Sequence, residues 1–114
     1  MAFTPYHNIT GSSSRENELM AIGDIARQKV KCINIANTHD SAAATVDLYL
    51  FKDSTDTTAS ETYYFFKNHQ IPFRGYTTLE SDDLLNFDNT IDTGFRLFIK
   101  IGSTDTVDVM IKKS

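Results

Sequence analysis

The sequence contains few cysteines, which form disulfides, and few glycines, which form phosphate-binding loops. Its 114 residues include one cysteine, two prolines, five glycines and no tryptophan. The single cysteine, Cys32, excludes an intramolecular disulfide framework. Its place in a strand-like run indicates a buried, reduced thiol rather than a nucleophile. With so few glycines, the sequence contains no glycine-rich phosphate loop.

Long apolar runs are also missing. No run approaches the roughly 20 residues that span a bilayer. The first residues, Met1 to Tyr6, lack the cationic and apolar segments of a secretory signal. We therefore expect a protein that is made in a cytosol-like compartment and stays there unless it leaves as part of an assembly. We expect no membrane partner.

Positive charge is scarce as well. The chain has 11 lysines and arginines against 15 aspartates and glutamates, which gives a net charge of −4. Nucleic-acid binding depends on a basic face that neutralises phosphates, and the basic residues here are spread thinly. We expect no nucleic-acid partner.

The three histidines do not form a recognisable site. His7, His39 and His69 are far apart, and none has a second ligand at a zinc-site spacing. The run His39-Asp40-Ser41 holds the residue types of a catalytic triad. Consecutive turn residues, however, cannot place the base between its two partners. We expect no catalytic residues.

The acidic residues are the remaining candidates for chemistry. Four aspartates surround a short predicted strand, and these are Asp82, Asp83, Asp88 and Asp92. Their spacing does not match an EF-hand loop, so we expect solvated turn aspartates, with a weak calcium site as the alternative. Paired carboxylates would suit a small hydrolase, but so short a chain has little room for a deep cleft beside a core. We expect no enzyme activity, no cofactor and no bound metal.

What the chain does contain is a period-two alternation of apolar and mixed residues. In its clearest run, Val46, Leu48 and Leu50 share one face, while the other face carries Thr45, Asp47, Tyr49 and Phe51. This pattern is typical of an antiparallel strand with one face in the core.

Several further runs show strand patterns. We predict a β-hairpin from the runs 30–36 and 45–51, and a second hairpin from 95–101 and 107–112, because short turn sequences separate the members of each pair. Other short strands are predicted at 62–66, 77–80 and 84–87, and the stretch 18–26 suits a short strand or a one-turn helix.

Together these runs predict an all-β fold. About 7–8 short strands with turns between them indicate an antiparallel β-sandwich of the jelly-roll or immunoglobulin-like type. We assign residues 16–114 to this single domain and residues 1–15 to an extended N-terminal arm. That arm is either a terminus that is disordered or folded back on its own sheet, or a segment that docks on a neighbouring subunit.

Several aromatic residues are predicted to face outward, which is unusual for a soluble domain. Large exposed apolar patches mark interfaces in soluble proteins. We predict an interface made by residues of the arm, the outer strand faces and one loop, namely Phe3, Tyr6, Tyr49, Phe51, Phe73 and Tyr76. The alternative is that the arm or a loop of the same chain covers these rings.

The strand cores also carry a family resemblance. The runs 32–37, 44–50, 62–68 and 107–111, with Ile71-Pro72 and Thr78-Leu79 between them, resemble the small β-sandwich virion structural proteins of marine tailed bacteriophages, including cyanophages. In the family pattern, Gly and then Thr-Leu follow Ile-Pro closely. Here Phe73-Arg74 and Tyr76-Thr77 lengthen that loop.

The resemblance implies a non-enzymatic virion component, a capsid decoration or cement protein or, alternatively, a neck or tail accessory protein. It implies multiple copies that contact each other and other virion proteins, in a virion assembled in the host cytoplasm. It defines no catalytic or ligand residue. A carbohydrate- or receptor-binding module is the alternative from another class, because exposed aromatic rings also stack on sugars.

Overall fold

The computed structural model describes residues 3–10, 16–20, 30–54, 57–80, 94–102 and 105–113. These residues contain eight strands and no helix. The strands are β1 (Phe3–Thr10), β2 (Glu16–Met20), β3 (Val30–Asn37), β4 (Ala44–Lys52), β5 (Glu61–Ile71), β6 (Tyr76–Glu80), β7 (Arg96–Ile101) and β8 (Thr106–Lys113).

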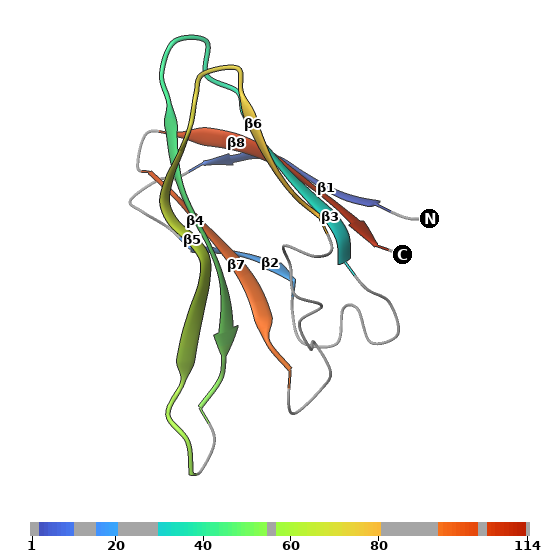
Figure 1. Cartoon of the computed structure of the whole chain (residues 1–114), viewed down its shortest axis with the longest axis vertical. Coiled ribbons are helices and arrows are strands. Elements are labelled where there is room, and N and C mark those ends of the chain that lie inside the picture. Colours follow the sequence, from blue (N-terminus) through green and yellow to red (C-terminus); the bar gives the residue numbers. More distant parts are fainter. Residues whose placement is uncertain are drawn as a thin grey trace.

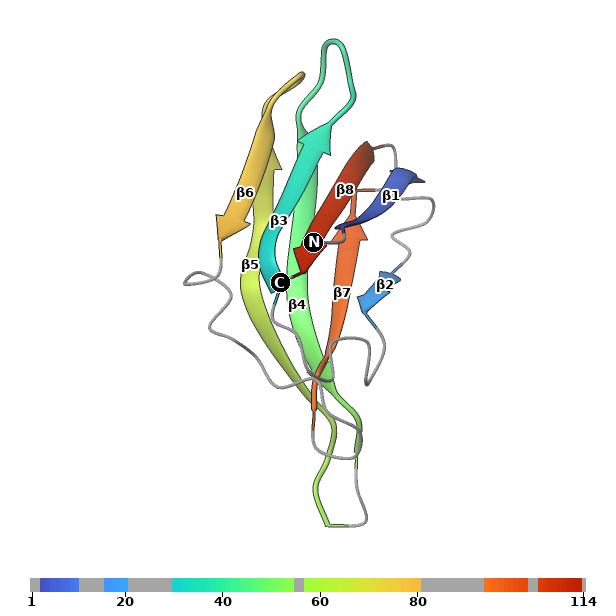
Figure 2. The ribbon, with the colours of Figure 1, turned by 90° about the vertical axis from the view of Figure 1, so that its right-hand side faces the viewer.

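The strands form two antiparallel sheets (Figure 1). The first sheet has the order β1-β8-β3-β6, and the second has the order β2-β7-β4-β5. Strands β5 and β6 lie at the same side of the two sheets, and β1 and β2 lie at the other (Figure 2). The prediction of an all-β fold built from antiparallel sheets is confirmed.

The core lies between the sheets. Val46, Leu48 and Leu50 of β4 are buried in one cluster with side chains of β7 and of the first sheet, which are Leu97, Ile99, Ile101, Ile33, Ile35, Val107, Val109 and Ile111. The period-two pattern of β4, β7 and β8 therefore identifies the core face correctly. Burial of these β-branched and leucine side chains is the main stabilising contribution in a domain of this size.

Neither predicted hairpin forms, although its strands do. Strand β3 belongs to the first sheet and β4 to the second, and likewise β8 and β7 lie in different sheets. The connection 38–43 therefore carries the chain from one sheet to the other, and β7 and β8 also follow one another in opposite sheets. The only consecutive strands that pair in the described part of the chain are β4 and β5.

The N-terminal residues 3–10 pair with β8 of the same chain, from Phe3 opposite Lys112 to Thr10 opposite Thr106. Of the two alternatives for the N-terminal arm, this is the terminus that folds back on its own sheet. Within the predicted stretch 18–26, the residues up to Met20 belong to strand β2, and residues 21–26 lie outside the described residues. The predicted strand at 84–87 and the four aspartates around it lie outside the described residues.

The crossing between β7 and β8 depends on Gly102 and Asp105. The Gly102 N–H donates to the Thr45 carbonyl oxygen at 2.9 Å, and the Asp105 N–H donates to the Gly102 carbonyl oxygen at 2.9 Å. In return, the Asp105 carboxylate accepts the Thr45 N–H at 2.9 Å. The end of β7 is therefore fastened to the start of β4 by one backbone hydrogen bond and by the side chain of Asp105.

Gly102 has no room for a side chain at this point. A Cβ atom there would lie 2.3 Å from Oδ2 of Asp105, the atom that accepts the Thr45 N–H. We expect Gly102→Ala to lower the free energy of unfolding by about 1–2 kcal/mol, because the carboxylate must leave its hydrogen bond. Urea denaturation measures this effect.

A double-mutant cycle with Asp105→Ala tests the reason for that loss. In the Asp105→Ala background, Gly102→Ala should be nearly neutral, since the clashing carboxylate is gone. Additive losses in the cycle would contradict the proposed clash.

Candidate functional site

A bulge in strand β5 marks the outer face of the second sheet. Val46 pairs with His69 and Leu48 pairs with Phe66, so two residues of β5, Lys67 and Asn68, lie opposite Asp47 alone. Asn68 has a φ of 55°, a left-handed conformation that asparagine tolerates better than most residues. A β-bulge of this kind takes one backbone group out of the regular ladder and redirects the neighbouring side chains.

The side chain of Asp47 compensates for the bulge. Its Oδ1 atom accepts the Asn68 N–H at 2.7 Å. A hydrogen bond from a backbone N–H to an ionised carboxylate is short and stronger than a neutral one. Asp47 is only 8% exposed, so a charged group lies nearly buried on the outer face of the sheet.

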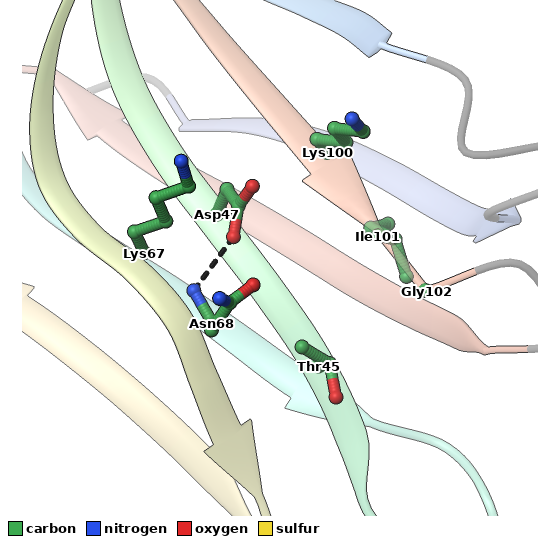
Figure 3. Close-up of a pocket in the computed structure, with 7 residues that line it drawn as sticks. All are labelled: Thr45, Asp47, Lys67, Asn68, Lys100, Ile101 and Gly102. Atoms are coloured by element: carbon green, nitrogen blue, oxygen red, sulfur yellow. Dashed lines mark hydrogen bonds between the residues drawn. The ribbon is translucent and has the colours of Figure 1, made fainter.

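A hollow of about 260 Å³ opens over this bulge (Figure 3). Its lining comes from β4, β5, β7 and the start of the β7–β8 turn, and consists of Thr45, Asp47, Lys67, Asn68, Lys100, Ile101 and Gly102. Asp47 and Lys100 are register partners on adjacent strands, which places both side chains on this face. The hollow therefore combines one carboxylate, two ammonium groups, an amide and a hydroxyl.

An aromatic cluster lies beside the hollow on the same face. It consists of Tyr49 and Phe51 of β4, Tyr64 of β5 and Phe98 of β7. The ring centroid of Tyr49 lies 5.3 Å from that of Tyr64 and 5.7 Å from that of Phe98. These are favourable separations for aromatic pairs. The rings share the outer face with Asp47 because they occupy alternate positions of the same strands.

Cations border this aromatic cluster. Nζ of Lys67 lies 5.0 Å from the centroid of the Tyr64 ring, and Cζ of Arg96 lies 4.9 Å from that of Phe98. Arg96 also donates hydrogen bonds to Glu18 of β2 and to Asp53. The hydrogen bond to Glu18 raises the pKa of Arg96, so this cation stays charged and ties the edge strand β2 to the aromatic cluster.

The predicted interface residues fall into three groups. Tyr49 is only 4% exposed and Phe51 is half-buried, so Tyr49 is not a free contact residue; its neighbours in the same sheet cover it. Phe73 and Tyr76 are exposed, at 52% and 70%. Phe3 and Tyr6 lie in β1 and pair with β8 through their backbone.

Two exposed aromatic residues, Phe73 and Tyr76, lie at the connection between β5 and β6. Phe73 lies in a tight turn that Gly75 closes by donating its N–H to the Pro72 carbonyl oxygen at 2.9 Å. Tyr76 begins β6 immediately after it. Tyr63 and Tyr64 are also exposed, at 50% and 46%, but they lie at the opposite end of β5, far from this turn. We call the exposed surface formed by Phe73 and Tyr76 the β5–β6 edge.

The two histidine side chains that the structure describes, His69 and His39, each lie beside one polar side chain. A ring nitrogen of His69 lies 2.9 Å from the Thr77 hydroxyl, which links β5 to β6 across the two sheets. His39 lies near Asp105, with 3.6 Å between Nε2 and Oδ1. Within the described ranges, no group of three or more histidine, cysteine, aspartate or glutamate side chains is arranged to hold a metal ion.

Sequence reasoning missed the residues that complete the hollow, Lys67, Asn68 and Lys100. The sequence placed Asp47 on the outer face correctly. It held no signal for the bulge, because an extra residue in one strand appears only once its partner strand is known.

No protein-family model matches the chain, and no curated protein matches it. No helix in the described part of the chain is long and apolar enough to cross a membrane.

Proposed function

We propose that the protein is a non-enzymatic structural component of a phage virion, a capsid decoration or cement protein present in many copies. The observation that carries the proposal is the exposed β5–β6 edge. The resemblance of the strand cores to small virion β-sandwich proteins supports a virion as the assembly in which this contact is made. A neck or tail accessory protein is the alternative position in the same particle.

The strand order supports this proposal. A first sheet ordered β1-β8-β3-β6 that faces a second sheet ordered β2-β7-β4-β5 is the arrangement expected of an eight-stranded jelly roll. Jelly rolls serve as viral capsid domains and as lectin domains. Since one fold supports many functions, the strand order alone does not assign a role, and the exposed surface carries the proposal.

The β5–β6 edge has the properties of a contact surface. It exposes two large aromatic side chains close together in the chain, Phe73 and Tyr76, and tyrosine is among the residues that contribute most to binding energy at interfaces. Strands β5 and β6 are also the last strands of their sheets in the described part of the chain. Strand edges offer backbone donors and acceptors to a partner.

Electron microscopy of purified particles tests the position of the protein. An antibody against the chain should label the particle surface at regular intervals if the protein decorates the capsid. Labelling confined to the neck or tail would favour the accessory alternative. Absence of the protein from purified particles, checked by mass spectrometry, would overturn both.

Substitutions at the β5–β6 edge test the proposed contact. We expect Tyr76→Ser and Phe73→Ser to fold like the parent protein, because both side chains are exposed. We expect each to weaken incorporation into particles by roughly thirtyfold, which corresponds to a hot-spot loss of about 2 kcal/mol. Quantitative mass spectrometry of purified virions measures incorporation.

The matched control is Met110→Ser. Met110 is 44% exposed but lies on the outer face of the first sheet, away from the edge. Its substitution should leave incorporation unchanged. Equal losses in all three variants would argue against a contact at the β5–β6 edge.

A further inference from the structure

We propose that the hollow around Asp47 is a binding site for one neutral sugar residue of a glycan, with the aromatic cluster beside it as a platform for the adjoining residue. This inference does not depend on the proposed place in a virion. It would give the protein a ligand-binding activity on the face of the second sheet, separate from the first sheet and from Phe73 and Tyr76.

The carboxylate of Asp47 is the central group. The Asn68 N–H occupies one of its oxygens. Among the described residues, no hydrogen-bond donor reaches the other oxygen. Asp47 is more than nine-tenths buried and lines the hollow. This oxygen faces the open hollow, so a ligand hydroxyl can donate to it in place of solvent, and a hydrogen bond to an ionised carboxylate is stronger than a neutral one.

The groups around Asp47 are hydrogen-bond donors. Lys67 and Lys100 form no ion pair with any described residue, and they line the hollow on either side of Asp47 (Figure 3). The Asn68 amide and the Thr45 hydroxyl add two groups able both to donate and to accept. A sugar matches this set because every hydroxyl both donates and accepts.

Charge argues against the simpler ligands. A phosphate or another small anion would meet the two ammonium groups, but it would also place its negative charge beside the nearly buried Asp47 carboxylate. A divalent cation would meet two ammonium groups and only one carboxylate, whereas calcium prefers several oxygen ligands. A neutral polyol meets neither repulsion.

Size and surroundings agree with a sugar. At about 260 Å³ the hollow is smaller than the roughly 300–1,000 Å³ typical of sites for drug-sized ligands, and it is open to solvent. Lys67 connects it to the aromatic cluster, since its Nζ lies over the exposed ring of Tyr64. A second sugar residue leaving the hollow along β5 would meet that ring, and aromatic faces attract apolar C–H surfaces.

Amide NMR of the full-length, isotope-labelled protein tests the proposal. The probes are glucose, galactose, mannose and N-acetylglucosamine, each titrated to tens of millimolar, with inorganic phosphate and calcium chloride titrated separately. We expect at least one sugar to shift the amide signals of Asn68 and Gly102 saturably. Weak affinity for one sugar is expected, because a shallow site makes few contacts; many copies on one particle would bind a polysaccharide more tightly through avidity.

Two variants locate the site. Asp47→Asn keeps an oxygen for the Asn68 N–H and so preserves the bulge, but it removes the charged acceptor. Lys100→Met removes a donor from a different strand. We expect each to weaken the sugar response by about tenfold, while Lys112→Met, on the outer face of the first sheet, leaves it unchanged.

The proposal is overturned if none of the four sugars shifts these amides. It is also overturned if phosphate or calcium alone does so, or if the response survives both site variants. These outcomes are separate from those of the assembly test, because Asp47→Asn and Lys100→Met leave Tyr76 and Phe73 intact. A failed incorporation test would therefore not contradict the sugar site, and a failed sugar titration would not contradict the contact at the β5–β6 edge.

Discussion

Replacing Leu97 by alanine is expected to lower the free energy of unfolding by about 2–5 kcal/mol. Leu97 lies in β7 at 0% exposure, and its register partners are Leu50 of β4 and Met20 of β2. The substitution removes buried methyl groups and leaves a cavity that packed neighbours fill only in part. Since domains of this size are stable by only about 5–15 kcal/mol, this single change removes a large fraction of the total.

Urea denaturation followed by circular dichroism measures the Leu97→Ala effect. Met110→Ala is the matched control, because it removes a side chain of similar volume from an exposed position of β8. The control should change stability by less than about 0.5 kcal/mol. Equal effects of the two substitutions would mean that the core does not lie between the two sheets.

Asn37→Ala is expected to cost about 3 kcal/mol, since three hydrogen bonds at about 1 kcal/mol each are lost. Asn37 ends β3 at 3% exposure. Its amide donates to the Ala42 carbonyl oxygen at 2.9 Å and to the Ile71 carbonyl oxygen at 3.0 Å, and one of its two hydrogens is shared with the Pro72 carbonyl oxygen at 3.3 Å. Its side-chain oxygen accepts the His39 N–H at 3.0 Å. One side chain thus holds the β3–β4 crossing against the end of β5.

The matched control for Asn37 is Asn34→Ala on the same strand. The Asn34 side chain accepts one exposed hydrogen bond, from the Thr78 hydroxyl at 2.7 Å, so its loss should cost at most about 1 kcal/mol. Asn37→Asp should be at least as damaging as Asn37→Ala, because a carboxylate would face the two carbonyl oxygens. If Asn37→Ala and Asn34→Ala were equally mild, Asn37 would not hold the crossing.

Strand pairing on either side of residues 38–43 and 102–105 could not be predicted from the sequence. The sequence predicted the strands on either side of residues 38–43 and 102–105, together with the turn residues between them. The strands on either side of each connection were predicted to pair as a hairpin, and both hairpin predictions were wrong. A turn within one sheet and a crossing to the opposite sheet need the same polar residues, and in both cases the apolar faces point to the core. The choice depends on which strands pair over long sequence separations.

For the aromatic residues, the sequence predicted orientation but not exposure. Alternation along β4 placed Tyr49 and Phe51 on the outer face correctly, yet it could not show that Tyr64 and Phe98 pack against Tyr49 and bury it. The exposure of Phe73 and Tyr76 likewise depends on the turn that separates β5 from β6. Outward orientation is a local property of a strand, whereas exposure depends on its neighbours in the sheet.

The period-two pattern by itself determined that this chain forms a β-rich core, and the single cysteine excluded a disulfide within the chain. Backbone pleating fixes which residues share a face, and that information is local. The tertiary structure alone decided which strands share a sheet, and it alone placed a bulge opposite Asp47. Strand pairing and bulges are relations between distant segments. For that reason the hollow formed by Asp47, Lys67 and Lys100 became visible only once β4, β5 and β7 lay side by side.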